Sequence, residues 1–65
     1  MAEKALYKIE ATDGITRQTM RYKKPVTLEE AKKKLQELFN DDYLGLDYYL
    51  LDAADNQIMA LEQDF

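Results

Sequence analysis

The sequence predicts a small α+β domain in the order hairpin, helix, hairpin (ββαββ), with a four-stranded sheet that carries one helix on one face. Three observations lead to this prediction: an alternating segment that ends at an Asp-Gly turn, an apolar stripe at helical spacing, and a β-rich run followed by a second turn signal. A chain of 65 residues has room for one core. Residues 1 to 65 are therefore expected to form a single domain.

The first hairpin is predicted from the segment Ala5 to Ala11, in which apolar residues alternate with polar ones as in a half-buried strand. The dipeptide Asp13-Gly14 follows, and it favours a tight two-residue turn. Such a turn pairs residues whose numbers sum to 27, so that Glu10 faces Arg17 across the ladder.

A helix is predicted after Pro25, which stops the second strand because proline cannot donate to a ladder. Thr27, with Glu30 three residues later, forms a capping box, and Asn40 is suited to a left-handed C-cap. The apolar residues of this segment lie on one helical stripe: Leu28, Ala31, Leu35, Leu38 and Phe39.

The second hairpin begins with Leu46 to Asp52, which has aromatic and aliphatic residues at both parities and so predicts a strand buried on both faces or central in the sheet. Residues 57 to 61 form the predicted return strand. The loop between them is either Asp55-Asn56 alone or residues 53 to 56, and the sequence does not decide between the two.

The order of these elements resembles that of β-grasp domains. The resemblance implies that the first and last strands form a central, parallel pair. It covers element order alone and carries no functional motif, so it implies no ligand and no activity.

Several kinds of chemistry are excluded by composition. The chain has no Ser, Cys or His, which removes Ser-His and Cys-His nucleophiles as well as thiolate and imidazole metal ligands. Its two glycines, Gly14 and Gly45, cannot form a phosphate-binding loop. Asp52 and Asp55 resemble the start of a Ca²⁺ loop, but the required glycine and bidentate glutamate are missing from it. We expect no enzyme activity, cofactor, metal or small-molecule ligand.

Charge is unevenly distributed along the chain. Residues 1 to 40 hold nine basic and six acidic residues, a net of +3, whereas residues 41 to 65 hold seven acidic residues and no basic one, a net of −7. One interpretation is solvation and mutual attraction between the two halves of the fold. The other is that the acidic second hairpin meets a basic partner surface.

The aromatic residues are concentrated in the same acidic half, and tyrosine is enriched at protein interfaces. Because one helix covers one face of the sheet, either Tyr48 and Leu50 or Tyr49 and Leu51 should emerge on the open face. The candidate partner-binding residues are Tyr43, Asp47, Tyr48, Tyr49, Leu50, Asp52 and Asp55.

These features predict a non-catalytic protein interaction module that acts through its acidic, tyrosine-rich second hairpin, as a homodimer or as an adaptor to a basic partner. The alternative is a small acidic inhibitor or DNA mimic, of the kind that phages encode, which blocks a nucleic-acid-binding or catalytic groove. A basic patch around Tyr22 (Arg17, Arg21, Lys23 and Lys24) is a feature of nucleic-acid-binding proteins. The net charge of −4 weighs against this function. No signal peptide or membrane-spanning run is recognised, so a cytoplasmic location is expected.

Overall fold

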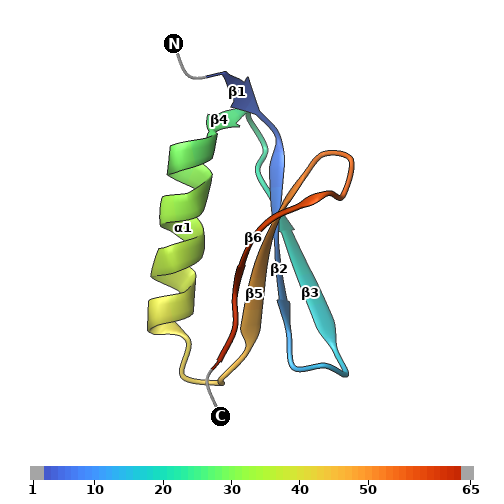
Figure 1. The fold of residues 1–65 in the computed structure, drawn as a ribbon, viewed down its shortest axis with the longest axis vertical. Coiled ribbons are helices and arrows are strands. Elements are labelled where there is room, and N and C mark those ends of the chain that lie inside the picture. Colours follow the sequence, from blue (N-terminus) through green and yellow to red (C-terminus); the bar gives the residue numbers. More distant parts are fainter. Residues whose placement is uncertain (1–2, 64–65) are drawn as a thin grey trace.

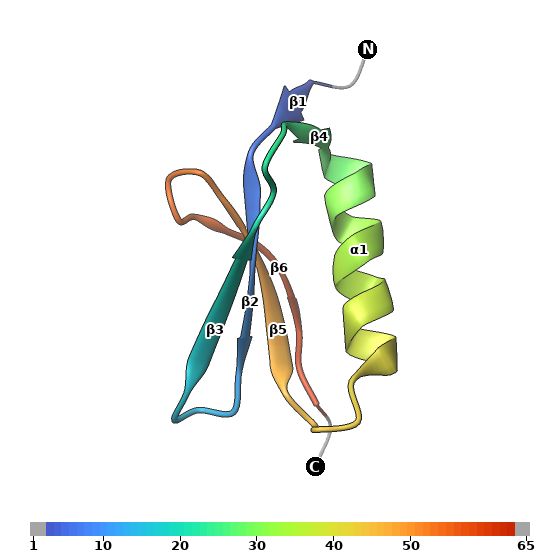
Figure 2. The ribbon, with the colours of Figure 1, turned by 180° about the vertical axis from the view of Figure 1, so that it is seen from behind.

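The computed structural model describes residues 3 to 63, which form an α+β fold with one helix, a four-stranded antiparallel sheet and a two-stranded sheet (Figure 1). The elements in chain order are β1 Lys4–Ala5, β2 Tyr7–Thr12, β3 Arg17–Arg21, β4 Val26–Thr27, α1 Leu28–Asp41, β5 Asp47–Asp52 and β6 Gln57–Leu61. The larger sheet has the order β3-β2-β5-β6, and β1 pairs with β4 beside the start of the helix (Figure 2).

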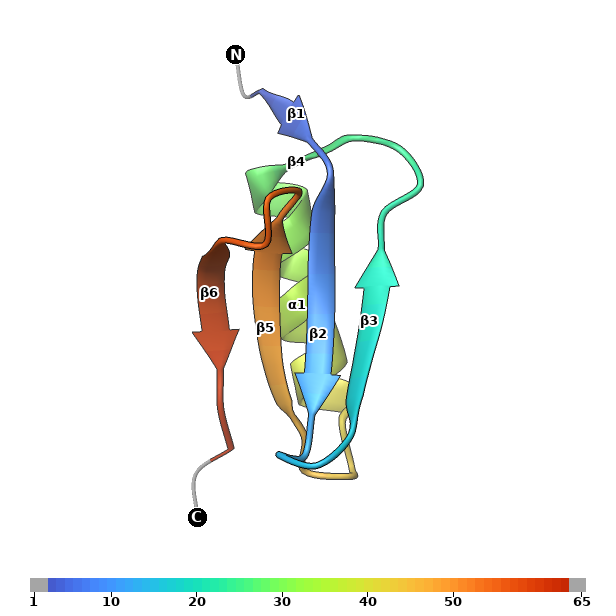
Figure 3. The same ribbon diagram turned by 90° about the vertical axis from the view of Figure 1, so that its right-hand side faces the viewer.

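The central pair of the sheet is β2 and β5, and the two strands are antiparallel. The expectation that the first and last long strands form a central, parallel pair is therefore wrong, and the resemblance to β-grasp domains is not confirmed. The helix returns the chain to the end at which β2 finishes, so β5 starts there and runs back beside β2 (Figure 3). The apolar character of β5 at both parities suits this central position.

The first hairpin has a different register from the one predicted. Glu10 lies opposite Thr19, so paired residue numbers sum to 29 and not to 27. The cause is a longer turn: the Asp13 carboxylate accepts hydrogen bonds from the amides of Ile15 (2.8 Å) and Thr16 (2.7 Å), and Gly14 has φ +92°. Because the shift is two residues, every side chain keeps its predicted face.

The helix begins as predicted, since Thr27 is its N-cap and the Thr27 hydroxyl accepts a hydrogen bond from the Glu30 amide at 3.2 Å. Its end differs from the prediction. Asn40 lies inside the helix, where its side chain accepts a hydrogen bond from Gln36, and the C-cap is Asp42 with an extended backbone. The Asp42 amide donates to the Phe39 carbonyl, which ends the helix without a left-handed residue.

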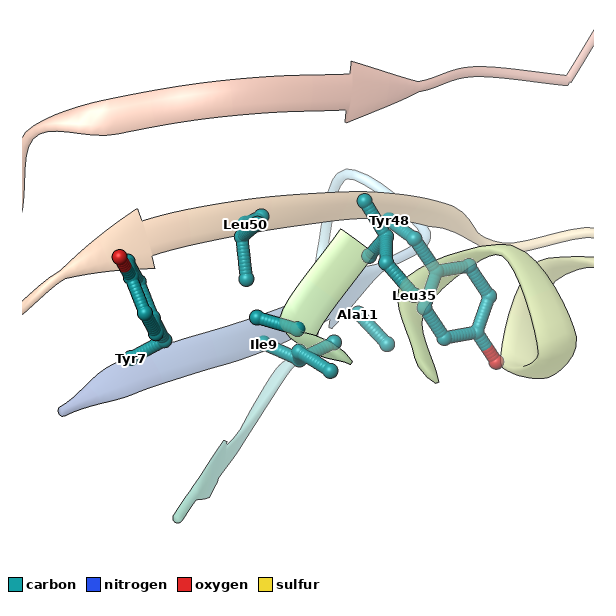
Figure 4. Close-up of a cluster of buried hydrophobic side chains, with 7 residues drawn as sticks. Tyr7, Ile9, Ala11, Leu35, Tyr48 and Leu50 are labelled. Atoms are coloured by element: carbon teal, nitrogen blue, oxygen red, sulfur yellow. The ribbon is translucent and has the colours of Figure 1, made fainter. Parts of the chain in front are cut away.

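The core lies between α1 and the two central strands (Figure 4). Leu35 of the helix and Leu50 of β5 are fully buried, and the ring of Phe39 meets that of Tyr48 edge to face at 6.2 Å. The buried residues of the cluster are Tyr7, Ile9, Ala11, Ala31, Leu35, Tyr48 and Leu50. Tyr48 and Leu50 therefore face the helix, which places Tyr49 and Leu51 on the open side of the sheet.

The loop of the second hairpin spans residues 53 to 56, the longer of the two alternatives. Leu50 pairs with Met59 and Leu51 with Gln57, so that Ile58 is an extra residue in β6 at this shift of register. Such a bulge bends and twists the edge strand that contains it.

Candidate functional site

The structure separates the predicted partner-binding residues into buried and accessible ones. Tyr48 and Leu50 are buried beneath α1, so their side chains belong to the core and not to a surface. Asp47, Tyr49 and Asp52 are partly buried, and Tyr43 and Asp55 are exposed. The apolar, two-parity pattern of β5 thus reflects its central position in the sheet.

Several carboxylates of the second half accept hydrogen bonds from backbone amides. Asp52 accepts hydrogen bonds from the amides of Ala54 and Asn56, each at 2.9 Å, and these bonds help to close the hairpin loop. The Asn56 bonds, with smaller contributions from Ala54 and Lys8, lower the pKa of Asp52 below its usual range. Asp47 likewise accepts from the amide of Gln63 at 2.9 Å. Both aspartates were predicted as partner-binding residues, and these backbone bonds give each of them a local structural role as well.

The open face of the sheet is mainly polar. Leu51 is only 7% exposed, because Lys8 lies directly opposite it and forms an ion pair with Asp55 of the following loop. A shallow hollow of about 410 Å³ covers this region, and its lining residues are Lys8, Glu10, Arg17, Thr19, Arg21, Leu51 and Asp55. The large apolar patch expected on this face is therefore reduced to the half-buried ring of Tyr49.

Tyr49 is surrounded by acidic residues. Its hydroxyl donates a hydrogen bond to Glu62 at 3.4 Å. Burial raises the pKa of Tyr49, and the neighbouring carboxylates of Glu62 and Asp47 raise it further.

The strongest apolar exposure lies at one end of the molecule, where the β2–β3 turn and the α1–β5 loop come to the same end (Figures 1 and 3). Ile15 in the turn is 92% exposed, and Tyr43 and Leu44 in the loop are 92% and 71% exposed. We define the acidic tip as these three residues together with Asp13 and Asp41, which are also exposed.

Of the acidic tip, sequence reasoning found only Tyr43. The sequence predicts no binding role for Ile15 or Leu44. Their place in a turn or loop is not a sufficient signal, because Leu46 of the same loop packs against the core. Only the fold shows that the two connections lie at the same end of the molecule.

A second exposed region is strand β3 itself, which lies at the edge of the sheet and is exposed over all five residues. Beside it, between the sheet and α1, is an apolar groove of about 210 Å³. The residues that line this groove are Ile9, Met20, Arg21, Tyr22, Lys34 and Leu38. We refer to this strand and groove as the β3 edge.

Tyr22 stands at the end of the β3 edge, and its hydroxyl is the buried side-chain polar atom that lacks a hydrogen-bond partner within residues 3 to 63. Burial raises the pKa of Tyr22, with contributions from the carboxylates of Glu30 and Glu37. Tyr22 therefore stays protonated well beyond neutral pH.

Within the described part of the chain, no group of three or more acidic side chains is arranged to hold a metal ion. The residues of the suggested Ca²⁺ loop are used otherwise, since Asp52 binds backbone amides and Asp55 pairs with Lys8. Over residues 3 to 63, the structure also contains no helix of the length and apolarity that a bilayer span requires.

Comparison with known proteins identifies no relative: no protein-family model, no curated protein and no solved structure matches this chain.

Proposed function

We propose that this chain is a non-catalytic protein-binding module that contacts a basic partner through its acidic tip. The observation that carries the proposal is the exposure of Ile15, Tyr43 and Leu44 at one end of the molecule. Large apolar side chains that are exposed on the surface of a small domain tend to mark interaction sites, and tyrosine is a common anchor in them.

Charge supports a basic partner over a second copy of the chain. Asp13 and Asp41 are exposed beside the apolar residues, and Asp42 lies within the same loop. Two acidic tips brought together would repel, whereas a basic surface would be attracted and oriented. The adaptor form of the prediction is therefore favoured over the homodimer.

We propose a non-catalytic module because of the composition of the chain. The chain has no Ser, Cys or His, so it lacks the side chains of Ser-His and Cys-His nucleophile pairs. Binding through exposed apolar side chains flanked by carboxylates does not require Ser, Cys or His.

The proposal can be tested by affinity capture from a lysate of the native host. A variant with both Tyr43→Ala and Leu44→Ala is compared with the natural sequence and with a matched variant carrying Leu6→Ala and Ile58→Ala, which removes apolar residues exposed elsewhere. We expect basic proteins to be retained by the natural sequence and the matched control, lost from the tip variant, and released as salt screens the charges.

Retention of the same proteins by the tip variant would contradict the proposal. If the retained proteins are DNA-binding proteins that nucleic acid displaces in competition, the result would favour the alternative of an acidic inhibitor.

A further inference from the structure

We propose that the β3 edge binds an extended, acidic segment of a partner protein as an added strand. This surface is separate from the acidic tip and takes a partner of opposite charge. Strand addition of this kind combines main-chain hydrogen bonds with pockets that receive alternate side chains.

The first argument concerns the backbone of β3. The Tyr22 amide donates to the Tyr7 carbonyl at 3.3 Å, which makes these two residues a hydrogen-bonded pair. Hydrogen-bonded and non-bonded pairs alternate along an antiparallel ladder. Arg17, Thr19 and Arg21 therefore direct their main-chain groups away from β2, toward the unpaired side of the edge. A complementary strand can bond to all three residues.

The second argument concerns the groove. Helix α1 lies over β5 and β2, and leaves the inner side of β3 uncovered (Figure 3). Met20 and Tyr22 are on that side and line the groove together with Leu38 of the helix. A volume of about 210 Å³ is smaller than a typical site for a drug-sized ligand, but it suits the apolar side chains of an added strand.

The third argument is charge complementarity, which identifies the occupant. Arg17 and Arg21 stand on the open side of β3, and Lys23 and Lys24 follow directly in the chain. Arg17 lies 3.9 Å from Glu10, and Arg21 forms no ion pair within residues 3 to 63. Lys34 adds a further cation at the groove.

These cations also disfavour a second copy of the chain as the strand that pairs with β3. Two β3 strands paired with each other would bring arginines together, and like charges opposite each other are destabilising. An acidic strand with apolar residues at every second position would instead place its carboxylates beside Arg17 and Arg21 and its apolar side chains in the groove.

The probe is a short peptide, acetylated and amidated, that alternates Glu and Val, and the matched control peptide alternates Lys and Val. Each is titrated into the full-length, isotope-labelled protein and followed by NMR. We expect the Glu-Val peptide alone to shift the signals of β3 and of Leu38, and to slow hydrogen exchange at the amides of Arg17, Thr19 and Arg21.

Two variants separate strand addition from simple charge attraction. Thr19→Pro removes an outward N–H from an edge position, where proline is tolerated, and should weaken Glu-Val binding by about tenfold or more, whereas Thr19→Val should not. A charge-reversed edge, with Arg21→Glu and Lys23→Glu, should prefer the Lys-Val peptide. The same reversal at Lys32 and Lys33, which are exposed on the helix, should leave the preference unchanged.

The proposal is overturned if the two peptides bind alike, if neither binds, or if the shifts fall on the acidic tip. It is also overturned if the protein without peptide associates through β3 at rising concentration, since a second copy would then be the occupant. If Thr19→Pro disrupts the fold, the variant with Arg21→Glu and Lys23→Glu still tests the proposal through its peptide preference. Both of its substituted residues are exposed, so the fold should tolerate the changes.

Discussion

Three aspartates of this protein act as turn builders. Asp13, Asp42 and Asp52 each accept hydrogen bonds from backbone amides that lie two to four residues further along the chain. In each case the carboxylate replaces a main-chain partner and closes a connection between two elements. Part of the acidic composition is therefore architectural, although these hydrogen bonds favour the charged form of the carboxylate and so leave its negative charge in place for a partner.

This role makes a prediction about acid stability. Hydrogen bonds from Thr16 and Ile15 lower the pKa of Asp13, and bonds from Asn56 lower that of Asp52. Because both values are lower in the folded state, the stabilisation is present above the unfolded pKa, which is about 3.9, and is lost as the pH falls through the folded values. A carboxyl NMR titration should show both groups titrating below that unfolded value. If either titrates at or above it, its turn bonds do not form.

The hydroxyl of Tyr22 leads to a different expectation. It is buried without a partner within residues 3 to 63, and an unsatisfied polar group of this kind costs free energy. Replacing Tyr22 by Phe should leave the free energy of unfolding unchanged or raise it by roughly 1 kcal/mol, as measured by urea denaturation. A clear loss of stability would mean that the hydroxyl has a partner in solution.

Among the elements, the helix was the most predictable from sequence, because its signals are local. The Thr27 cap and the apolar stripe depend only on residues within one or two turns, and the structure confirms both. The register of the first hairpin was wrong because Asp13 has two options. With Gly14 it forms a two-residue turn, whereas with its own side chain it bonds to Ile15 and Thr16 and lengthens the turn.

The cap supports a prediction for the helix as a whole. Thr27→Ala removes the acceptor of the Glu30 amide and should cost about 1 kcal/mol, which in a domain of this size lowers the melting temperature by roughly 4 to 8 °C. Thr27→Ser keeps the acceptor oxygen and is the matched control. Equal melting temperatures for the Ala and Ser variants would show that the hydroxyl does not hold the helix start.

For the molecule as a whole, the sequence allowed the general class of surface to be predicted but not its location. Acidity and tyrosine content pointed to the second hairpin, yet Tyr48 and Leu50 are buried by the helix. The acidic tip combines residues of the β2–β3 turn with residues at the end of α1 and in the loop that follows, and no local pattern shows that two connections so far apart in the chain lie at the same end of the molecule (Figures 1 and 3). The predicted strand order also leaves β3 at an edge of the sheet. The groove beside this strand was not predicted, because it depends on where the helix lies across the sheet.

The same strand order predicts that neither hairpin folds alone. Residues 1 to 46 contain β2, β3 and the helix but lack β5, which supplies Tyr48 and Leu50 to the core. A fragment of these residues should therefore lack the dispersed amide spectrum of a folded protein. Addition of residues 47 to 65 as a separate peptide should restore it. A fragment that is folded without the peptide would contradict this prediction.

The antiparallel pairing of β2 with β5 also affects how the chain is made. Tyr7 lies opposite Asp52, so the central pairing of the sheet joins residues that are far apart in the sequence. A fold whose contacts join residues far apart in sequence has a high contact order, and it folds more slowly than a helical domain of equal length. During synthesis, strands β2 and β3 must wait for the helix and β5 to be made. A product that terminates before β5 is complete would expose both strands and should be a target for degradation.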